Sequence, residues 1–358
     1  MKNKQLLIYG LVLVVLAALM YAQFRTWRNF DWQTFWTQWK HINPLNILCA
    51  VVLIYITYFL RAWRWAIFLR PVRNGIAAGQ LLPPTMIGFT GLALLGRAGE
   101  LIRPYLIARR TKLSFSSQMA VWAVERIFDV GAFTILLVLA IFLPTDLRFL
   151  PNLEIYPRLR TGGFLLIGLV AFIAMTAMIV ARYGDLVAEW IERRFAHLAA
   201  NLGHRIAQKI REFHGGLDTI HGFVSFVELT LVSLLMWWLI ALSYREVTHS
   251  YGAALADITI SKVLLLMGSS MLGSLIQLPG VGGGSQLATI SALEHIFNAS
   301  HELAANCGIL LWLVTFVSIV PAGLLLAHQE RLSLRRLSDE AHLNEEGRMP
   351  AAATPPPA

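Results

Sequence analysis

The stretch Gly96-Arg97-Ala98-Gly99-Glu100-Leu101-Ile102-Arg103-Pro104 sets how the rest of the sequence is interpreted. It directly follows an apolar run, 86–95, in a chain that is apolar almost throughout. Charged groups in or beside a hydrocarbon core are costly and usually face a cavity, a partner or a substrate. Three charges and two glycines where a hydrophobic segment stops therefore predict a helix broken at membrane depth, turned towards something polar.

The composition indicates an all-α polytopic membrane protein. Of the 358 residues, 56% are hydrophobic and 14% are charged, whereas soluble domains carry roughly 25% charged residues. The length allows about eight membrane segments of ~20 residues with their loops. The net charge of +9 is explained by Lys and Arg in cytoplasmic loops beside anionic lipid. Nucleic acid is not an expected partner, because the sequence has no basic soluble domain.

Hydropathy predicts nine apolar segments. Pro83-Pro84 is expected to break the third segment, and the glycines of 280–284 precede the eighth, so neither is expected to span. The segments are 5–22, 44–69, 79–95, 119–143, 161–182, 223–245, 258–277, 285–297 and 303–327.

The positive-inside rule selects an arrangement of these segments. Arginines cluster after the second segment, after the third, in the long middle loop and at the start of the tail. All four clusters lie in the cytoplasm if there are about six full spans and two re-entrant elements of opposite orientation, as in transporters with inverted repeats. One element is 79–95, and the other is the hairpin of 258–277 and 285–297. If 258–277 crosses by itself, the tail arginines lie outside.

This arrangement predicts one transmembrane domain over 1–327, which we expect in a bacterial inner membrane with both termini cytoplasmic. The first segment is interpreted as an uncleaved span, because Met20-Tyr21-Ala22 is a poor cleavage site. The region 183–222 is expected to be an amphipathic cytoplasmic loop, and 328–358 a disordered tail. The tryptophans of 27–39 predict an interfacial aromatic belt.

The segment 96–103 is the first of three polar constellations. Its glycines allow tight backbone geometry, and exposed amides at a helix start favour anions. Arg97 and Arg103 can each donate a bidentate fork to phosphate or carboxylate, and Glu100 can orient one of them or contact an amine. An ordinary cytoplasmic loop with topogenic arginines explains this segment equally well.

The second constellation is Glu125-Arg126-Ile127-Phe128-Asp129, in the first turns of an apolar span. Glu125 and Asp129 are one turn apart and share a helix face. Two acids and an arginine at this depth predict ion pairing, most simply with the arginines of the first constellation. Direct contact with a substrate and a purely structural ion-pair network are both compatible with this pattern.

The third constellation, 277–286, predicts a sharp hairpin turn between two apolar legs. Its second leg would begin a helix with Ser285 as N-cap. A tight extramembrane loop is the alternative, and the flanking polar residues favour a lined cavity. The residues expected to contact substrate here are Gln277, Gly280, Gly282, Gly283, Ser285 and Gln286.

Other polar residues within apolar segments are given lesser roles. Arg61 and Arg64, one turn apart, are expected to snorkel to the cytoplasmic surface. Glu228 and Lys262 could pair with each other. The two cysteines form no CxxC or Cys/His cluster, so neither a metal site nor a disulfide framework is expected.

The three constellations, in this order and spacing, resemble those of the lysylphosphatidylglycerol synthase/flippase-like transmembrane family, the UPF0104 type of membrane protein. The resemblance covers residues 5–327. It is carried by Gly96-Arg97-Ala98-Gly99-Glu100 with Arg103, by Glu125-Arg126 with Asp129, and by Leu278-Pro279-Gly280 with the following glycines.

The resemblance implies a lipid-translocating membrane domain. Members with a cytosolic aminoacyl-transferase domain make and flip aminoacylated phospholipids, and this chain is expected to lack that domain. The family turn usually carries an acidic residue where Gln286 stands. A missing carboxylate would weaken selection for a cationic headgroup, whereas the arginine-rich motifs suggest an anionic group such as lipid phosphate.

The sequence thus predicts a transporter that moves an anionic phospholipid or polyprenyl-phosphate lipid between leaflets through a polar intramembrane cavity. Arg97 and Arg103 would hold the phosphate, and Glu125 and Asp129 would orient them. No GxxxxGK[ST] loop occurs, so movement would be downhill or ion-coupled, and no cofactor is expected.

Two other functions are weighed against transport. In an intramembrane lipid-modifying enzyme, Glu125 or Asp129 would be the general base. This is disfavoured because no His or Ser nucleophile lies beside them. An accessory subunit of an envelope-lipid assembly complex would use the charges structurally. A homo-oligomer or an envelope-synthesis partner is compatible with either class.

Overall fold

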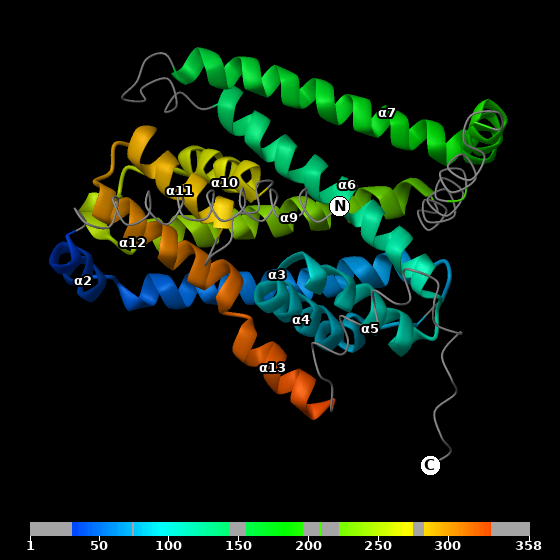
Figure 1. Ribbon diagram of the computed structural model, residues 1–358, viewed down its shortest axis with the longest axis horizontal. Coiled ribbons are helices and arrows are strands. Elements are labelled where there is room, and N and C mark those ends of the chain that lie inside the picture. Colours follow the sequence, from blue (N-terminus) through cyan, green and yellow to red (C-terminus); the bar gives the residue numbers. More distant parts are fainter. Residues whose placement is uncertain are drawn as a thin grey trace, which may run out of the picture.

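The computed structural model describes residues 31–73, 75–143, 155–195, 208, 222–274 and 283–330. Within this part every regular element is a helix (Figure 1), which confirms the all-α prediction. The predicted span 5–22, the tail after 330 and most of the middle loop lie outside the described residues. The elements are α2 (Trp32–Lys40), α3 (Pro44–Leu69), α4 (Ala78–Leu95), the 3-10 helix η1 (Gly96–Leu101), α5 (Ile102–Thr111), α6 (Phe115–Phe142), α7 (Ile155–Phe195), α9 (Gly222–His249), the 3-10 helix η3 (Gly252–Ala254), α10 (Ile260–Ser274), α11 (Gly283–His295), α12 (His301–Trp312), the π-helix η4 (Leu313–Val317) and α13 (Val320–Gln329).

Several of these helices have the length and apolar surface of membrane spans. Four described stretches qualify by length and composition, namely Pro44–Leu69, Ala78–Leu95, Val224–His249 and His301–Gln329. Helix α6 has 28 residues, long enough to cross, but carries three charges near its middle. The chain is a multi-pass membrane protein, and the number of full crossings stays a prediction.

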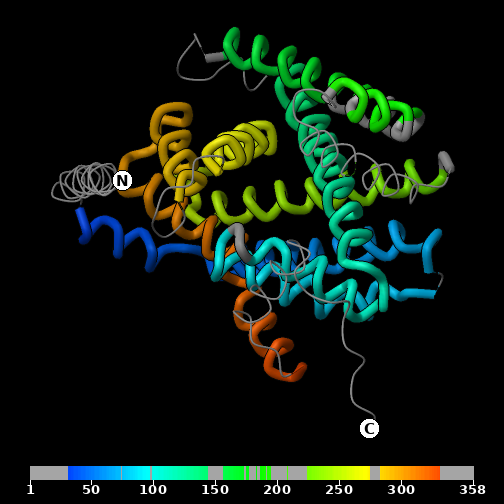
Figure 2. Tube along the Cα trace, turned by 45° about the vertical axis from the view of Figure 1, so that its right-hand side comes forward, coloured from blue at the N-terminus to red at the C-terminus, as the bar shows by residue number. Residues whose placement is uncertain are grey.

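Helices α3 and α9 form the central antiparallel pair (Figures 1 and 2). Asn43, whose side chain caps the first turn of α3, also donates its backbone N–H to the carbonyl of Ser250, 2.9 Å away. At the other end, Arg70 pairs with Glu228 at 2.5 Å. We call the end with Asn43 the α2 face and the end with Arg70 the opposite face.

Helices α4 and α5 form a hairpin whose two ends lie at the opposite face. Arg73, just after α3, donates a hydrogen bond to the carbonyl of Thr111 at the end of α5. The predicted break at Pro83-Pro84 is wrong, since α4 continues through both prolines. Both prolines lie in the second turn of α4. Proline has no backbone N–H, so the only hydrogen bonds lost are those to carbonyls in the first turn of the helix. The helix instead ends at Gly96, with φ 63° and ψ −141°, a conformation that glycine adopts readily.

Glycine allows the two legs of this hairpin to touch. A Cβ on Gly99 would overlap the carbonyl of Gly91, and one on Gly88 would overlap the Cβ of Arg103. Small residues let helix backbones approach closely inside membranes. The hairpin therefore fixes the height and direction of Arg103.

Helices α10 and α11 form a second hairpin, which opens to the α2 face. His249 contacts the Ile258 carbonyl at 3.1 Å before α10, and Glu294 near the end of α11 pairs with His301. The predicted N-cap role of Ser285 is wrong. Helix α11 begins at Gly283, so Ser285 lies inside the first turn, and its hydroxyl hydrogen-bonds that of Ser270 at 2.7 Å. The two hairpins open towards opposite faces; that they are re-entrant elements stays a prediction.

Helix α7 lies on the outside of the bundle beside α6 (Figures 1 and 2). Its ring contact with α6 joins Phe164 to Phe142 at 5.0 Å between centroids. Large apolar side chains such as Leu165 and Phe172 are exposed, as expected for contact with lipid. The helix is kinked at Tyr183, the residue after the predicted span 161–182.

The glycine contact at the tip of the first hairpin can be tested by adding a methyl group. Gly99→Ala should destabilise the protein by about 1–3 kcal/mol, because overpacking forces the legs apart. Gly131→Ala is the matched control, since nothing lies within 4 Å of a Cβ there. Thermal unfolding in detergent should show a fall in melting temperature for Gly99→Ala and none for Gly131→Ala. Equal melting temperatures would contradict the close approach.

Candidate functional site

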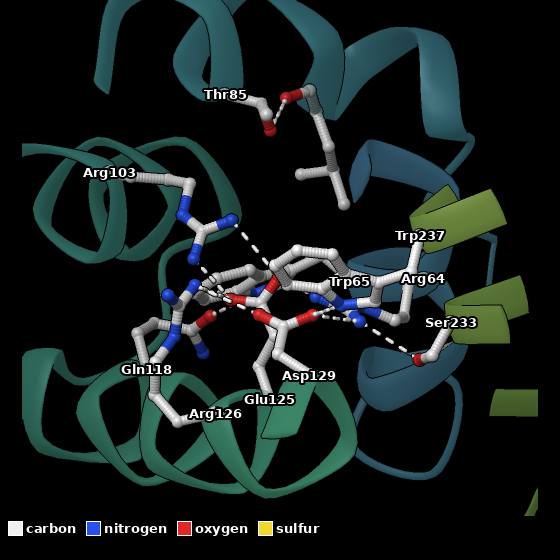
Figure 3. A network of polar contacts seen from close by, with 11 residues as sticks. Arg64, Trp65, Thr85, Arg103, Gln118, Glu125, Arg126, Asp129, Ser233 and Trp237 are labelled. Carbon is white, nitrogen blue, oxygen red and sulfur yellow. Dashed lines mark hydrogen bonds and ion pairs between the residues drawn. The ribbon is translucent and has the colours of Figure 1, made fainter. Parts of the chain in front are cut away.

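A cluster of buried charges joins α3, α5 and α6 (Figure 3). We call it the arginine cluster; its members are Arg61, Arg64, Arg103, Glu125, Arg126 and Asp129. Glu125 is at its centre and is 1% exposed. Its Oε1 accepts from Arg64 Nη2 at 2.6 Å and from Arg103 Nη1 at 3.1 Å, and its Oε2 accepts from Arg103 Nη2. Arg103 therefore grips this carboxylate with both prongs of its fork, the strong geometry for such a pair.

Asp129, one turn further along α6, extends the cluster to α9. Its Oδ1 accepts from Arg64 Nη1 at 2.7 Å and from the indole N–H of Trp237 at 3.3 Å. Arg64 also donates to the hydroxyl of Ser233 at 2.9 Å. Its guanidinium thus ties α3 to α6 and α9 while it is fully buried.

Aromatic rings support the arginines from the side. The guanidinium of Arg103 lies 4.4 Å from the Trp65 ring and 5.1 Å from the Phe89 ring, and that of Arg61 lies 4.7 Å from Phe89. Such contacts between cations and ring faces are worth about 2 kcal/mol or more when desolvated. Trp65 is itself fixed by donating to the side chain of Gln118 at 2.9 Å.

The cluster holds more positive than negative charge. Four arginines face two carboxylates, and Glu100, which is close enough to attract Arg126, reduces the excess from two charges to one. The Nε–H groups of Arg61, Arg64 and Arg126 are buried and have no acceptor among the described residues, whereas Asp129 Oδ2 is the one acceptor of the cluster that is buried there without a hydrogen-bond donor. The cluster therefore has spare hydrogen-bond donors as well as spare positive charge.

Arg126 is the partly open member of the cluster. Its side chain is 43% exposed, against 5% or less for Arg64, Arg103 and both acids. It pairs with Asp129 Oδ2 at 3.2 Å and with Glu125 Oε2 at 3.5 Å. It lies 11 residues beyond the start of α6, roughly 17 Å along the axis at 1.5 Å per residue, whereas a hydrocarbon core is ≈30 Å thick. An arginine half exposed within a span needs water or an anion beside it.

The structure brings the first two predicted constellations together. Arg103, Glu125, Arg126 and Asp129 share the cluster, which confirms the predicted pairing between an arginine after 96 and the acids of α6. Glu100 lies beside it, on η1. Arg97 is also on η1, but its side chain is outside the described part.

The third constellation does not join the described part of the cluster. Gly283, Ser285 and Gln286 lie on α11, which packs on α10 and α12; the Gln286 carbonyl lies against Gly308 of α12. Gln277, Gly280 and Gly282 lie outside the described residues. Substrate contact by any residue of the three constellations stays a prediction.

Two lesser expectations are wrong. Arg64 does not snorkel to the surface, because two buried carboxylates hold it inside the bundle. Glu228 and Lys262 do not pair: Glu228 binds Arg70, and Lys262 donates to the Asp257 carbonyl at 2.9 Å. The sequence pointed to Arg64 only as an arginine within a 26-residue apolar span. Ser233 and Trp237 have no comparable signal in the sequence.

A polar cavity of about 210 Å³ lies at the opposite face, beside the open end of the first hairpin. Its polar side chains are those of Arg73, Gln80, Arg110 and Thr111. Arg110 pairs with Glu330 at 2.9 Å, and both side chains are partly exposed. This cavity offers positive charge at one mouth of the bundle.

Residues 7–326 match the family described as the lysylphosphatidylglycerol synthase TM region. The chain belongs to this family. A UPF0104 membrane protein of Methanothermobacter thermautotrophicus is a relative, 23% identical over 79% of this chain and 85% of the relative.

A second similarity is local. The chain is 33% identical over 89 residues to the glycosyltransferase AglD of Haloferax volcanii, which covers 25% of this chain and 14% of that protein. No solved structure matches.

Two arginines six residues apart, one within α3 and one directly after it, allow the stability contribution of the buried ion pairs to be compared with that of a surface pair. Arg64→Met removes the fully buried partner that Glu125 and Asp129 share and should destabilise the protein by about 3–5 kcal/mol. Arg70→Met breaks a pair whose arginine is 50% exposed and should change stability by less than about 1 kcal/mol.

Thermal unfolding in detergent, followed by tryptophan fluorescence, measures both variants. Arg64→Lys should not restore stability, because one ammonium cannot reproduce a fork that spans two carboxylates. Similar melting temperatures for Arg64→Met and Arg70→Met would show that the cluster is not a structural centre.

Proposed function

We propose that this membrane protein moves an anionic lipid between leaflets and that the lipid phosphate binds the arginine cluster at Arg126. The acyl chains would remain in the surrounding lipid while the headgroup passes through the protein. The barrier to unassisted flipping is the transfer of a charged group into hydrocarbon. Fixed donors and positive charge at membrane depth lower that barrier by replacing water around the phosphate.

The excess of positive charge and of unfilled donors carries this proposal. A cluster built only for structure would be expected to balance its charges, because an unpaired buried charge is strongly destabilising. Water could fill the three Nε–H groups but would leave the excess charge. A phosphate supplies both acceptors and the missing negative charge, and arginine forks match its geometry.

Arg126 is the residue best placed to meet the phosphate. Arg64 and Arg103 are held by the two carboxylates and are buried, so their role here is to position Glu125 and Asp129. These acids in turn hold Arg126, which still presents 43% of its side chain outside the cluster. In this proposal Arg126, and not the predicted Arg103, binds the phosphate.

The cavity at the opposite face supports a path to this site. Arg73 and Arg110 would attract a headgroup phosphate at the mouth, before it reaches the cluster. Family membership supports a lipid as the ligand, since the family description names a phospholipid synthase.

The geometry does not favour an intramembrane enzyme. Glu125 is paired with three arginines and Asp129 with two, and such partners stabilise the ionised carboxylate, which makes it a weak general base. The similarity to a glycosyltransferase covers too little of that protein to favour transfer chemistry here.

A reconstituted assay tests transport directly. Purified protein is placed in liposomes with a fluorescent phosphatidylglycerol, and the reducible fraction in the outer leaflet is followed over time. Arg126→Gln should slow exposure of the labelled lipid tenfold or more, equivalent to about 1.4 kcal/mol. Arg126→Lys should retain part of the rate, since it keeps the charge but not the fork.

Arg193→Gln is the matched control, because Arg193 is also paired with an acid on its own helix but is 80% exposed. Its rate should equal that of the unaltered protein. Melting temperatures check that the Arg126 variants are folded. Equal rates for Arg126→Gln and Arg193→Gln would reject the proposed role of Arg126, and no protein-dependent flipping at all would reject transport.

A further inference from the structure

A second polar cavity lies at the α2 face, far along the bundle from the arginine-rich mouth. Its volume is about 350 Å³, large enough for part of a lipid headgroup. Helix α2 forms one wall, and the loop around η3 and the start of α12 form the other. The lining residues are Asp31, Gln33, Thr34, Thr37, Gln38, His41, Tyr251, Ala254 and Leu303.

The chemistry of this wall differs from that of the arginine cluster. Seven of the nine lining residues carry a hydrogen-bonding side chain, and none is Lys or Arg. Hydrogen bonds from the side chain and backbone of Thr34 lower the pKa of Asp31, so its carboxylate stays ionised at neutral pH. A negative charge with no Lys or Arg beside it among the described lining residues disfavours phosphate here. Alternating donors and acceptors instead suit a ligand that carries several hydroxyl groups.

Gln38 provides a group that the protein leaves unused. Its Oε1 is buried and has no hydrogen-bond partner among the described residues. A buried polar atom in this state is destabilising, because it has lost its hydrogen bonds to water without replacement. Rotation about the last side-chain bond would turn the amide into the cavity, where a ligand hydroxyl could donate to it. Tyr251 cannot compete for it, because it donates to Asn306 Oδ1 at 2.7 Å.

The cavity lies at the level where headgroups are expected. Trp32 and Trp36 on α2 are 44% and 56% exposed, and tryptophans gather at the boundary between hydrocarbon and water. Helix α2 has nine residues and is held by its Asp31 cap and by Asn306 of α12, which donates to the Phe35 carbonyl at 2.9 Å. A headgroup in the adjacent leaflet could therefore reach the cavity from the membrane plane.

We infer that the α2-face cavity binds the hydroxyl-bearing part of a lipid headgroup, such as glycerol or a sugar. This deepens the proposed function, on which the choice of a lipid as ligand rests. The phosphate would be bound by the arginine cluster, and the hydroxyl groups by α2 after the headgroup reaches this face. The substrate class becomes lipids that combine a phosphate with a polyol.

Hydrogen–deuterium exchange of the full chain in nanodiscs tests this inference. The discs contain phosphatidylcholine alone, or with phosphatidylglycerol, phosphatidic acid or a glucosyl diacylglycerol. Phosphatidylglycerol and phosphatidic acid are both anionic, but only the former has free headgroup hydroxyls. Exchange of the α2 amides should slow several-fold with phosphatidylglycerol and with the glucosyl lipid, and should not change with phosphatidic acid. Free methyl glucoside in phosphatidylcholine discs separates a lipid headgroup from a soluble polyol.

Gln38→Leu should abolish the slowing, whereas Lys40→Gln, on the same helix but outside the cavity lining, should leave it intact. Gln38→Asn, which shortens the side chain without adding an apolar group, should weaken it even if Gln38→Leu disturbs α2. Equal slowing by phosphatidic acid, or slowing that survives both Gln38 variants, would overturn the inference. If methyl glucoside slowed exchange but neither phosphatidylglycerol nor the glucosyl lipid did, the ligand would be a soluble polyol and not a lipid headgroup.

The design separates this inference from the proposed function. Arg126→Gln should leave protection of α2 by phosphatidylglycerol unchanged when the lipid is supplied to both leaflets. Protection of α2 together with absent flipping would reject transport and leave the α2 site standing. Flipping with no protection of α2 would reject only the α2 site.

Discussion

The buried guanidinium of Arg64 is the interaction on which the rest of the bundle depends. It joins α3 to both acids of α6 and to α9 within hydrogen-bonding distance. In a membrane, apolar packing gives little preference for one helix neighbour over another, because lipid tails are equally apolar. Charge pairs that are satisfied in only one arrangement supply that preference. Removal of one partner leaves the others stranded, so the cluster enforces the relative positions of three helices.

The first hairpin is added to these three helices by the close packing of its two legs. Gly88 and Gly99 let α4 and α5 approach until the side chain of Arg103 emerges directly beside Glu125. A larger residue at either glycine would move Arg103 relative to a carboxylate that it grips with both prongs. The hairpin is therefore matched to the cluster, and its glycines and its arginine act together.

Helix positions could be predicted from hydropathy, because the apolar period and length are local properties. The span 44–69 coincides with α3, and the break after Leu95 lies where Gly96 ends α4. Pro83-Pro84 misled the prediction, because prolines close to a helix start are tolerated and only the three-dimensional neighbours decide whether the helix continues. Ser285 misled it for a related reason, since a helix start one turn earlier converts a cap into an internal residue.

The cluster was predictable only in part. Glu125 and Asp129 share a face by spacing alone, and a nearby arginine partner follows from the cost of burying them. Arg64 was harder to place, because a snorkelling arginine and a buried one have the same sequence pattern, and the partner 61 residues away decides between them. Ser233 and Trp237 depend on the packing of α9, which no local pattern encodes.

The two polar sites differ in sign as well as in position, and this difference bears on direction. The arginine cluster and the mouth beside it offer positive charge, whereas the α2-face cavity offers neutral hydrogen-bonding groups beside a carboxylate. A phosphate that is bound strongly at one depth and poorly at the next would be held rather than released, unless another part of the headgroup gains contacts as the phosphate loses them. Hydroxyl groups that reach α2 would provide that compensation. The same reasoning requires that the cluster bind phosphate only moderately, and the competition of Glu125 and Asp129 for its arginines has that effect.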